Sequence, residues 1–522
     1  MRKLWRFTGG IKLNGFKALS NNAINYDLPI PEKLILPVRQ HIGDVTKPLV
    51  YVGDHVFKGQ LLASSTSFIS APVHASSSGT IVDIGKYPIP HQSGISESCI
   101  VIETDGLDEW DPTISANIHP EKLTVEQLHA LIKSAGIVGL GGAVFPSAAK
   151  LKPTRPIKTL IINGVECEPY ITCDDVLMQS RSDEIIRGVM LLKKMLSPDE
   201  CTIAIEDNKP NAKRALENAL KKMYSAGVDE TTNINVIAIP TIFPAGSEKQ
   251  LIKVLTGKEV PQQGLPYEVG VVCLNVGTTA AVYDAVYQGQ PLISRVVTVT
   301  GPEISQPQNY QVLLGTPVNH LLEASGGTKT DNYKLIMGGP MMGMRLPDSQ
   351  VPIVKASNCI LVESLAQKQN EKVMPCIRCG ACTTVCPMKL LPQQLYWHAK
   401  SKNFEKLDHY NLSDCIECGC CALVCPSKIP LVHYFRYAKS EKSENEIKEK
   451  LADQSRIRSL ARVERLEKIK REVEERKAKR KADRQKKKSI ESKKEKVKGE
   501  APTKNTESGE RKEVEPKKVA IG

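Results

Sequence analysis

Two short cysteine segments constrain this chain more than any other feature of its sequence. CIRCGACTTVCP begins at Cys376 and CIECGCCALVCP begins at Cys415, and both follow the spacing Cys-x-x-Cys-x-x-Cys-x-x-x-Cys-Pro. In this spacing the first three thiolates bind one [4Fe–4S] cluster, and the fourth binds the neighbouring cluster. The sequence therefore predicts a domain built around two iron–sulfur clusters that share their ligand loops.

The spacing also assigns the ligands of each predicted cluster. Cluster 1 is predicted to bind Cys376, Cys379, Cys382 and Cys425. Cluster 2 is predicted to bind Cys415, Cys418, Cys421 and Cys386. A pair of zinc ribbons is the alternative, and it is disfavoured because zinc sites usually join two Cys-x-x-Cys pairs through a longer spacer. Cys420 falls outside the register and is predicted to be a packed thiol.

The other cysteines do not indicate a disulfide framework. The amino-terminal segment MRKLWRFTGGIKLNG is basic but no apolar run follows it, so we expect no secretory signal and a cytoplasmic location. Thiols stay reduced in that compartment and are available to metals. The isolated residues Cys99, Cys201, Cys273 and Cys359 are predicted to be small buried hydrophobes.

The formal charge of +13 is unevenly distributed. Residues 440–522 hold 28 of the 71 basic and 18 of the 58 acidic residues, which leaves only +3 on the preceding part. The nearly neutral main part disfavours a nucleic-acid-binding role. No apolar run is long enough to span a bilayer, so a membrane role would depend on partners.

A glycine-rich turn lies in the middle of the chain. TVEQLHALIKS (124–134) has a helical apolar period opened by a Thr cap, and GIVGLGGAVFPSAAK follows it. Glycines let backbone amides approach a phosphate, and Lys150 could neutralise its charge. The spacing matches neither the dinucleotide fingerprint nor the nucleoside-triphosphate loop.

The next segment alternates strands and helices. TLIINGVECEPYITCDD reads as a buried strand over Thr159–Asn163 that runs into an acidic loop with Glu166 and Glu168, a position suited to ribose hydroxyls. CTIAIED, a helix over 211–226 and NVIAIP continue the alternation. This pattern predicts an α/β domain with a mostly parallel sheet.

Four motifs in this region resemble the NADH-binding, FMN-carrying subunit of respiratory complex I. In chain order they are GLGGAVFPSAAK, NGVECEP, AGSEKQLI and NVGT, and the resemblance covers about residues 125–285. It implies contacts to FMN and NADH by Gly139, Gly141, Gly142, Phe145, Lys150, Asn163, Glu166, Glu168, Gly246, Glu248, Asn275 and Thr278. Leu140, Val144 and Val165 depart from the pattern of that subunit, and a cofactor-free domain that keeps the fold is the alternative.

The flanking segments complete a multidomain α+β architecture. GDHVFKGQ and SAPVHASSSGTIVDIG resemble the barrel-sandwich hybrid of biotinyl carriers without its carrier lysine, and SRVVTVTG resembles a β-grasp domain. The predicted domains are a barrel-sandwich docking domain (1–124), a Rossmann-like FMN/NADH domain (125–285), a β-grasp domain (286–345), a two-cluster ferredoxin domain (346–440) and a charged tail (441–522).

This domain order resembles the C subunits of the bacterial ion-translocating Rnf (Rsx) electron-transport complexes, over about residues 1–440. The resemblance implies a peripheral subunit on the cytoplasmic face of the inner membrane, bound to the other subunits of the complex. Such a subunit passes electrons between NADH and a low-potential ferredoxin or flavodoxin carrier through FMN and two [4Fe–4S] clusters, while its partners move ions. Hydride transfer needs no acid–base residue, so no catalytic residue is predicted.

Two other functions remain open at this point. One is a soluble NADH:ferredoxin flavoprotein without ion pumping, and the other is a non-enzymatic iron–sulfur adaptor.

The charged tail does not discriminate between these functions. Its apolar residues Ile457, Leu460, Val463, Leu466, Ile469 and Val473 recur at three and four residues and predict one amphipathic helix. Beyond Lys477 only charge and low complexity remain, which predicts disorder.

Overall fold

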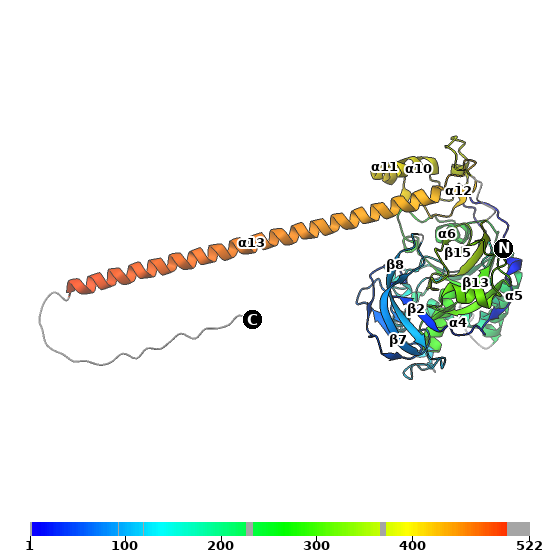
Figure 1. Ribbon diagram of the computed structural model, residues 1–522, viewed down its shortest axis with the longest axis horizontal. Coiled ribbons are helices and arrows are strands. Elements are labelled where there is room, and N and C mark those ends of the chain that lie inside the picture. Colours follow the sequence, from blue (N-terminus) through cyan, green and yellow to red (C-terminus); the bar gives the residue numbers. More distant parts are fainter. Residues whose placement is uncertain (1–2, 92, 118, 226–232, 366–371, 498–522) are drawn as a thin grey trace. The chain divides into compact units, whose positions relative to one another are not determined.

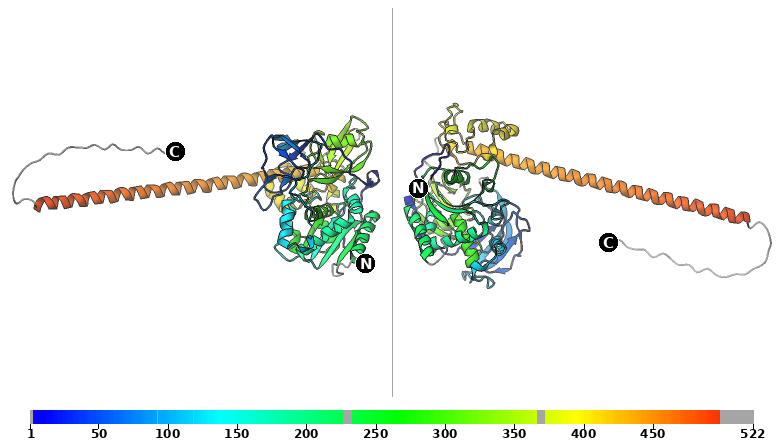
Figure 2. Two further views of the ribbon diagram at one scale, coloured as in Figure 1. Left: turned by 90° about the horizontal axis from the view of Figure 1, so that it is seen from below. Right: turned by 180° about the vertical axis from the view of Figure 1, so that it is seen from behind.

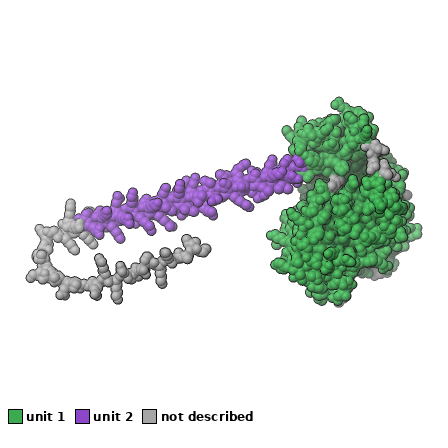
Figure 3. All heavy atoms as spheres, viewed as in Figure 1, with its two compact units in different colours: residues 1–440 green, residues 441–522 purple. Residues whose placement is uncertain are grey.

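The structure is a computed structural model that describes residues 3–91, 93–117, 119–225, 233–365 and 372–497. The chain divides into two compact units, Met1–Ser440 and Glu441–Gly522 (Figure 3). All residues predicted to bind a cofactor lie in the first unit.

Two small antiparallel sheets form the barrel-sandwich part of the first unit. One has the order β2 (Lys33–Pro37), β8 (Ser96–Thr104), β7 (Gly79–Pro88) and β4 (His55–Val56). The other has the order β3 (Lys47–Pro48), β5 (Leu61–Ser64) and β6 (Val73–His74). Leu34, Leu36, Ile81, Ile100 and Ile102 are fully buried in one apolar core. The predicted barrel-sandwich fold is confirmed.

A four-stranded parallel sheet forms the centre of the predicted FMN/NADH domain (Figure 1). Its order is β11 (Ile234–Ile239), β10 (Glu200–Glu206), β9 (Thr159–Gly164) and β12 (Val271–Asn275), and every neighbouring pair is parallel. Parallel strands need crossover connections, and helices supply them here. The predicted strands and the mostly parallel sheet are therefore confirmed.

Helices cover both faces of this sheet because alternate strand residues point to opposite sides. Leu160 and Ile162 of β9 point to one face of the sheet, where most of the helices pack. Ile161 points to the other face and packs against the helix over residues 248–256. The helices are α1 (Val125–Ser134), α2 (Ser147–Lys150), α3 (Cys173–Ser180), α4 (Ser182–Leu196), α5 (Pro210–Ser225), α6 (Glu248–Thr256) and α7 (Val276–Tyr287).

The predicted Thr cap before the glycine-rich turn is present. The Thr124 side chain accepts a hydrogen bond from the Gln127 amide, and the Gln127 side chain accepts one from the Thr124 amide. This reciprocal pair satisfies two amides that a helix start otherwise leaves without partners. It fixes where α1 begins, and the glycine-rich turn follows its far end.

A mixed six-stranded sheet contains the predicted β-grasp strands and reaches beyond their predicted range of 286–345. Its order is β1 (Ile24–Asn25), β14 (Gln308–Leu313), β13 (Ser294–Thr300), β17 (Cys359–Ser364), β15 (Tyr333–Met337) and β16 (Met344–Arg345). Helix α8 (Val318–Ala324) follows β14. The strands at 24–25 and 359–364 pair with partners distant in sequence, which local patterns cannot reveal.

The two cysteine segments fold as a repeated unit. Short helices α9 (Ala381–Thr384) and α12 (Cys420–Leu423) begin after Gly380 (φ 77°) and Gly419 (φ 79°), which occupy equivalent positions. Glycine adopts this left-handed conformation without a steric penalty. Between the repeats lie α10 (Pro392–Lys400) and α11 (Phe404–His409), and α13 (Leu431–Val497) follows the second repeat (Figure 2).

Helix α13 corrects part of the prediction for the tail. The structure continues the helix to Val497, whereas the sequence predicted disorder beyond Lys477. Lys, Arg, Glu, Gln and Ala favour helix, and neither Gly nor Pro interrupts them before Gly499. The predicted amphipathic face is also absent. The apolar residues lie mostly three positions apart, and three positions turn the helix by about 300° rather than a full 360°. Successive apolar side chains therefore point in different directions around the helix. Residues 498–522 lie outside the described residues.

No helix in the described part of the chain combines the length and the apolar character that crossing a membrane requires.

Candidate functional site

The glycine-rich turn is a tight loop held closed at its base. The amide of Gly139 donates to the Phe145 carbonyl (2.9 Å), and the amide of Val144 donates to the Gly139 carbonyl (3.2 Å). The Leu140 amide donates to Oγ1 of Thr278 on α7 (2.9 Å), which ties the loop to the start of that helix. Thr278 is fully buried, so it positions the loop from beneath.

The tip of this loop has the properties of an anion-binding cradle. The amides of Gly141, Gly142 and Ala143 donate to no acceptor within the described residues. A Cβ atom on Gly141 would lie 3.4 Å from Cβ of Asn275, and a Cβ on Gly142 would have no atom within 4 Å. The loop therefore approaches the start of α7 on one side and is open on the other, as a bound phosphate requires.

Two asparagines join the loop to the carboxyl ends of β9 and β12. Asn163 Nδ2 donates to the Gly246 carbonyl (2.8 Å), and Asn275 Nδ2 lies 3.5 Å from the Asn163 carbonyl oxygen. Asn275 also caps α7, because its Oδ1 accepts from the Gly277 amide (2.8 Å). The structure thus brings together Gly141, Asn163, Gly246 and Asn275, at the sheet edge where α/β folds bind ligands.

Lys150, the last residue of α2, forms an ion pair with Glu248, the first residue of α6. Burial alone would lower the pKa of Lys150, but the Glu248 carboxylate more than offsets it and raises that pKa. Both side chains keep more than a quarter of their surface exposed. Lys150 therefore stays charged and reachable by an anionic group.

Glu166, by contrast, is turned into a buried charged network. Its Oε2 lies 3.1 Å from Nζ of Lys209 and 3.9 Å from Nζ of Lys17, and its Oε1 accepts from the Asp174 amide (2.8 Å). Burial opposes ionisation, but the two lysines lower the pKa of Glu166 below its ordinary value. Both carboxylate oxygens are thus engaged by the protein.

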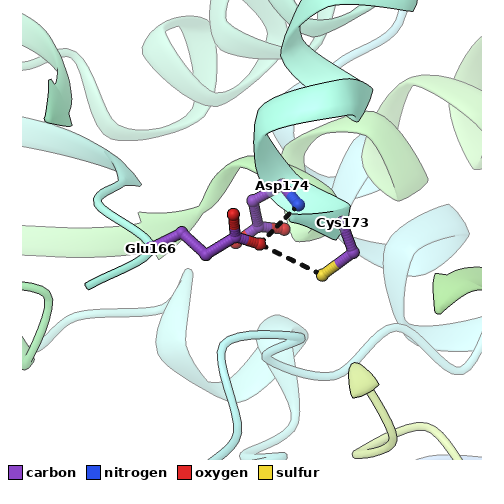
Figure 4. A group of neighbouring side chains, drawn as sticks. All are labelled: Glu166, Cys173 and Asp174. Carbon is purple, nitrogen blue, oxygen red and sulfur yellow. Dashed lines mark hydrogen bonds between the residues drawn. The ribbon is translucent and has the colours of Figure 1, made fainter. Parts of the chain in front are cut away.

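Figure 4 shows Glu166 with Cys173 and Asp174 of α3. One donor atom from each lies within 4.8 Å of the others, a spacing compatible with a metal ion. However, the Cys173 thiol donates to Glu166 (3.4 Å), and Lys209 already neutralises that carboxylate. Burial and the neighbouring Glu166 raise the pKa of Asp174 to about 6. The group is better explained as an internal ion-pair network than as a metal site.

Glu168 points elsewhere, toward the turn after β15. Its Oε1 accepts from the amides of Met341 (2.7 Å) and Met342 (3.0 Å). A Cβ atom on Gly339 would lie 2.1 Å from Cγ of Glu168, so the side chain lies directly against the turn. Burial raises the pKa of Glu168.

The cysteines line two separate hollows. The first hollow is lined by Cys376, Cys379, Cys382 and Cys425, with Gln393 and Tyr396. The second hollow is lined by Cys386, Cys415, Cys418 and Cys421, with Cys420 and Phe435. Among the eight predicted ligands, each hollow therefore gathers three thiols from one segment and the fourth thiol from the other segment, and Cys420 is an additional thiol at the second hollow.

The two hollows differ in exposure. In the first hollow Cys379 is exposed, and Cys376, Cys382 and Cys425 are half-buried. In the second hollow Cys386, Cys418 and Cys421 are buried, and only Cys415 is half-buried. Cys420 is fully buried against Phe243 and Cys418, in agreement with a packed thiol. Cys99, Cys201, Cys273 and Cys359 are also buried, as predicted.

Sequence reasoning missed the two lysines of the charged network. Lys17 donates to the carbonyls of Glu166 (2.7 Å) and Glu168 (2.8 Å), although it lies about 150 residues away along the chain. Lys209 is 3% exposed and joins Glu166 to Glu206. In the sequence, Lys209 is only a lysine between a predicted strand and a predicted helix, and such lysines are too common to indicate a functional role.

Four family models match separate parts of the chain. They are described as the RnfC barrel sandwich hybrid domain (residues 5–107), the Nuo51 FMN-binding domain (132–284), the SLBB domain (296–345) and the 4Fe-4S dicluster domain (375–429). Their order confirms the multidomain α+β architecture predicted from the sequence.

Curated relatives match over about four-fifths of the chain. The chain is 44% identical over 422 residues to the C subunit of the ion-translocating oxidoreductase complex of Pseudomonas aeruginosa, and the match covers 79% of this chain and 53% of that protein. Proteins of the same name from Haemophilus influenzae (44%) and Vibrio cholerae (47%) also match over 79% of this chain, which covers 62% and 52% of their lengths. The chain thus spans little more than half the length of these relatives.

Among solved structures, the NAD+-reducing [NiFe]-hydrogenase in its H2-reduced state has a TM-score of 0.46 and 19% identity, covering 63% of this chain and 65% of that chain. Its air-oxidised state has a TM-score of 0.43 and 20% identity. These structural similarities are too weak to support a conclusion. The curated relatives and the barrel-sandwich match are stronger, and they show that this chain is similar, over about four-fifths of its length, to the C subunits of ion-translocating oxidoreductase complexes.

Proposed function

We propose that this chain is the peripheral electron-transfer subunit of a membrane-bound oxidoreductase complex. In this role it exchanges electrons between NADH and a low-potential carrier through FMN and two [4Fe–4S] clusters, while membrane partners couple the transfer to ion movement. The observation that carries the proposal is the presence, in one compact unit, of an open glycine-rich cradle and two cysteine-lined hollows.

The cysteine hollows fit iron–sulfur clusters in their donor sets. Four cysteines line the first hollow, five line the second with Cys420 counted, and no histidine lines either one, which suits a cubane cluster better than a mixed zinc site. Cluster 1 would bind Cys376, Cys379, Cys382 and Cys425. Cluster 2 would bind Cys415, Cys418, Cys421 and Cys386. This crossed arrangement is the one that the sequence spacing predicts.

The cradle fits the phosphate of FMN. The amides at Gly141 and Gly142 and the start of α7 would bind the phosphate, and Lys150 would supply a positive charge. Asn163 and Asn275 would orient the ring system from the carboxyl ends of β9 and β12. The remaining predicted contacts are Gly139, Phe145, Glu166, Glu168, Gly246, Glu248 and Thr278. Of these, Thr278 and Glu166 have buried side chains, so they would support the site from the protein interior.

The residues near the cradle bind and orient but carry no acid–base role. FMN, when bound, converts between the two electrons of a hydride and single-electron transfer. A Cβ atom on Gly142 would meet no atom within 4 Å, so this side of the loop is open to a ligand. The named relatives are subunits of a complex, which supports other subunits as partners. The proposal places the chain peripherally, at the cytoplasmic face of the inner membrane.

Reconstitution with iron, sulfide and FMN tests this proposal. NADH added without air is expected to bleach first the flavin absorbance and then the cluster absorbance. A matched variant, Gly141→Val, places a branched side chain against Asn275 and is expected to lose FMN while it keeps its iron. Intact clusters and bound FMN that NADH fails to bleach would refute NADH as the electron donor. Native protein that binds no FMN would instead favour an iron–sulfur adaptor.

A further inference from the structure

Glu168 connects the parallel sheet to the turn over 338–343. It follows β9, and its Oε1 accepts both the Met341 and the Met342 amides, at 2.7 and 3.0 Å. Gly339 leaves the space in which the Glu168 side chain lies. Two amide hydrogen bonds to one half-buried carboxylate are charge-assisted and hold the turn in one place.

The other side of this turn lies against the second cysteine segment. A Cβ atom on Gly419 would come 2.8 Å from the Met341 carbonyl oxygen, so the turn touches the loop between Cys418 and Cys420. Arg436 strengthens this contact, because its Nη2 donates to the Met342 carbonyl (3.0 Å) and its Nε donates to Glu417 (2.9 Å). The turn therefore lies between Glu168 and the second hollow.

Cys167 forms a second contact between the same parts. It packs in one apolar cluster with Cys418, Cys420 and Phe243, while its Sγ accepts from the Gly246 amide (3.3 Å). Cys418 lines the second hollow, and Gly246 belongs to the predicted flavin pocket. No cysteine of the first hollow belongs to this apolar cluster in the described part of the chain.

We propose that Glu168 is a positioning residue that holds the second hollow (Cys386, Cys415, Cys418 and Cys421) against the flavin pocket. The second hollow is then the first electron acceptor, and the first hollow, with its exposed Cys379, is the outer one. This inference rests on the proposed function. NADH gives up two electrons and one proton as it becomes NAD+. The two clusters take one electron each, and the proton goes to solvent.

The proposal differs from the role that the resemblance to complex I implies, a direct contact of Glu168 with NADH. A nucleotide contact would make loss of the carboxylate slow the reduction of FMN by NADH. A positioning role predicts instead a slower transfer from reduced FMN to the clusters, because small displacements reduce rates steeply. The ratio of the two rates separates the roles.

The test uses the full chain reconstituted with FMN and both clusters, in rapid-mixing and light-driven experiments. In the rapid-mixing experiment NADH reduces FMN. In the light-driven experiment light and a sacrificial donor reduce bound FMN, so that cluster reduction is followed independently of NADH. Glu168→Ala is expected to slow cluster reduction about tenfold more than FMN reduction. Glu168→Gln keeps an oxygen that accepts both amides and is expected to restore the ratio.

Two further variants test whether the effect is specific to the contact between the flavin pocket and the second hollow. Cys167→Ala should also slow cluster reduction, whereas Cys201→Ala, at a buried thiol of β10, should not. Iron and flavin counts show whether each variant is assembled. Equal slowing of both steps in Glu168→Ala, or no slowing of cluster reduction, would overturn the positioning role. Failure of NADH alone, with normal light-driven transfer in the parent chain, would refute the proposed donor and leave the positioning role intact.

Discussion

At the scale of single residues, the buried charges are the least expected feature. Lys355 is 1% exposed, and its Nζ donates to the carbonyls of Pro72 (2.8 Å) and Gly136 (2.7 Å). It thereby joins the barrel-sandwich part to the residue that opens the glycine-rich turn. Burial lowers the pKa of Lys355 to about 7.

The lowered pKa of Lys355 makes stability depend on pH. Between about pH 7 and its ordinary value of 10.5 the unfolded chain binds a proton that the folded chain does not, so stability rises with pH across this window. Lys355→Met should remove a rise on the order of 5 kcal/mol, measured by urea unfolding across the window. An unchanged slope in the variant would show that Lys355 is not the titrating group.

Lys209 gives a second prediction at this scale. Its Nζ lies 3.1 Å from Glu166 and 3.3 Å from Glu206, so Lys209→Met removes the nearest positive charge from two buried carboxylates. We expect a loss of about 3–5 kcal/mol in the free energy of unfolding. Lys213→Met, on the helix that follows Lys209 but in an exposed pair with Glu217, is the control and should cost less than about 1 kcal/mol. Similar losses in both variants would contradict the account of the network.

At the scale of elements, the sequence predicts regular structure well wherever one face is buried. The strand at 159–164 and helix α5 follow the apolar pattern closely, because a single sheet decides which residues face the core. The tail was predicted less well. The described side chains over residues 443–492 are exposed and pack into no core, so helix propensity alone decides how far the helix continues.

The repeated cysteine loops allow a matched comparison of two glycines. Gly380 and Gly419 have nearly the same positive φ, but a Cβ atom on Gly380 meets nothing within 4 Å, whereas one on Gly419 meets the Met341 carbonyl. Gly380→Ala should therefore cost only the strain of the backbone, about 1–2 kcal/mol. Gly419→Ala should cost about 1–3 kcal/mol more. Thermal loss of cluster absorbance measures both, and equal costs would argue against the contact with the turn.

At the scale of the whole molecule, the candidate site is only partly readable from sequence. The crossed grouping of cysteines follows from spacing, and the structure shows the same grouping in its two hollows. The engagement of Glu166 by Lys17 and of Glu168 by the turn at 338–343 could not be read in this way. Those contacts join segments about 150 residues or more apart, and only the tertiary fold brings them together.

The division into two units gives a prediction about the tail. A chain that ends at Ser440 keeps every residue of the cradle and of both hollows. It should bind the same iron and flavin as the full chain and lose much of the helical circular-dichroism signal, since most of α13 lies beyond Ser440. Loss of cofactors on truncation would show that the second unit takes part in assembly of the site.

We propose that this chain holds two [4Fe–4S] clusters beside one FMN. A count of iron, acid-labile sulfide, zinc and flavin in the full chain, purified without air, tests it most directly. We predict about eight iron and eight sulfide per chain, one FMN and no zinc. Cys425→Ala and Cys386→Ala should each remove about four iron, from different clusters. About two zinc ions without sulfide would contradict the account.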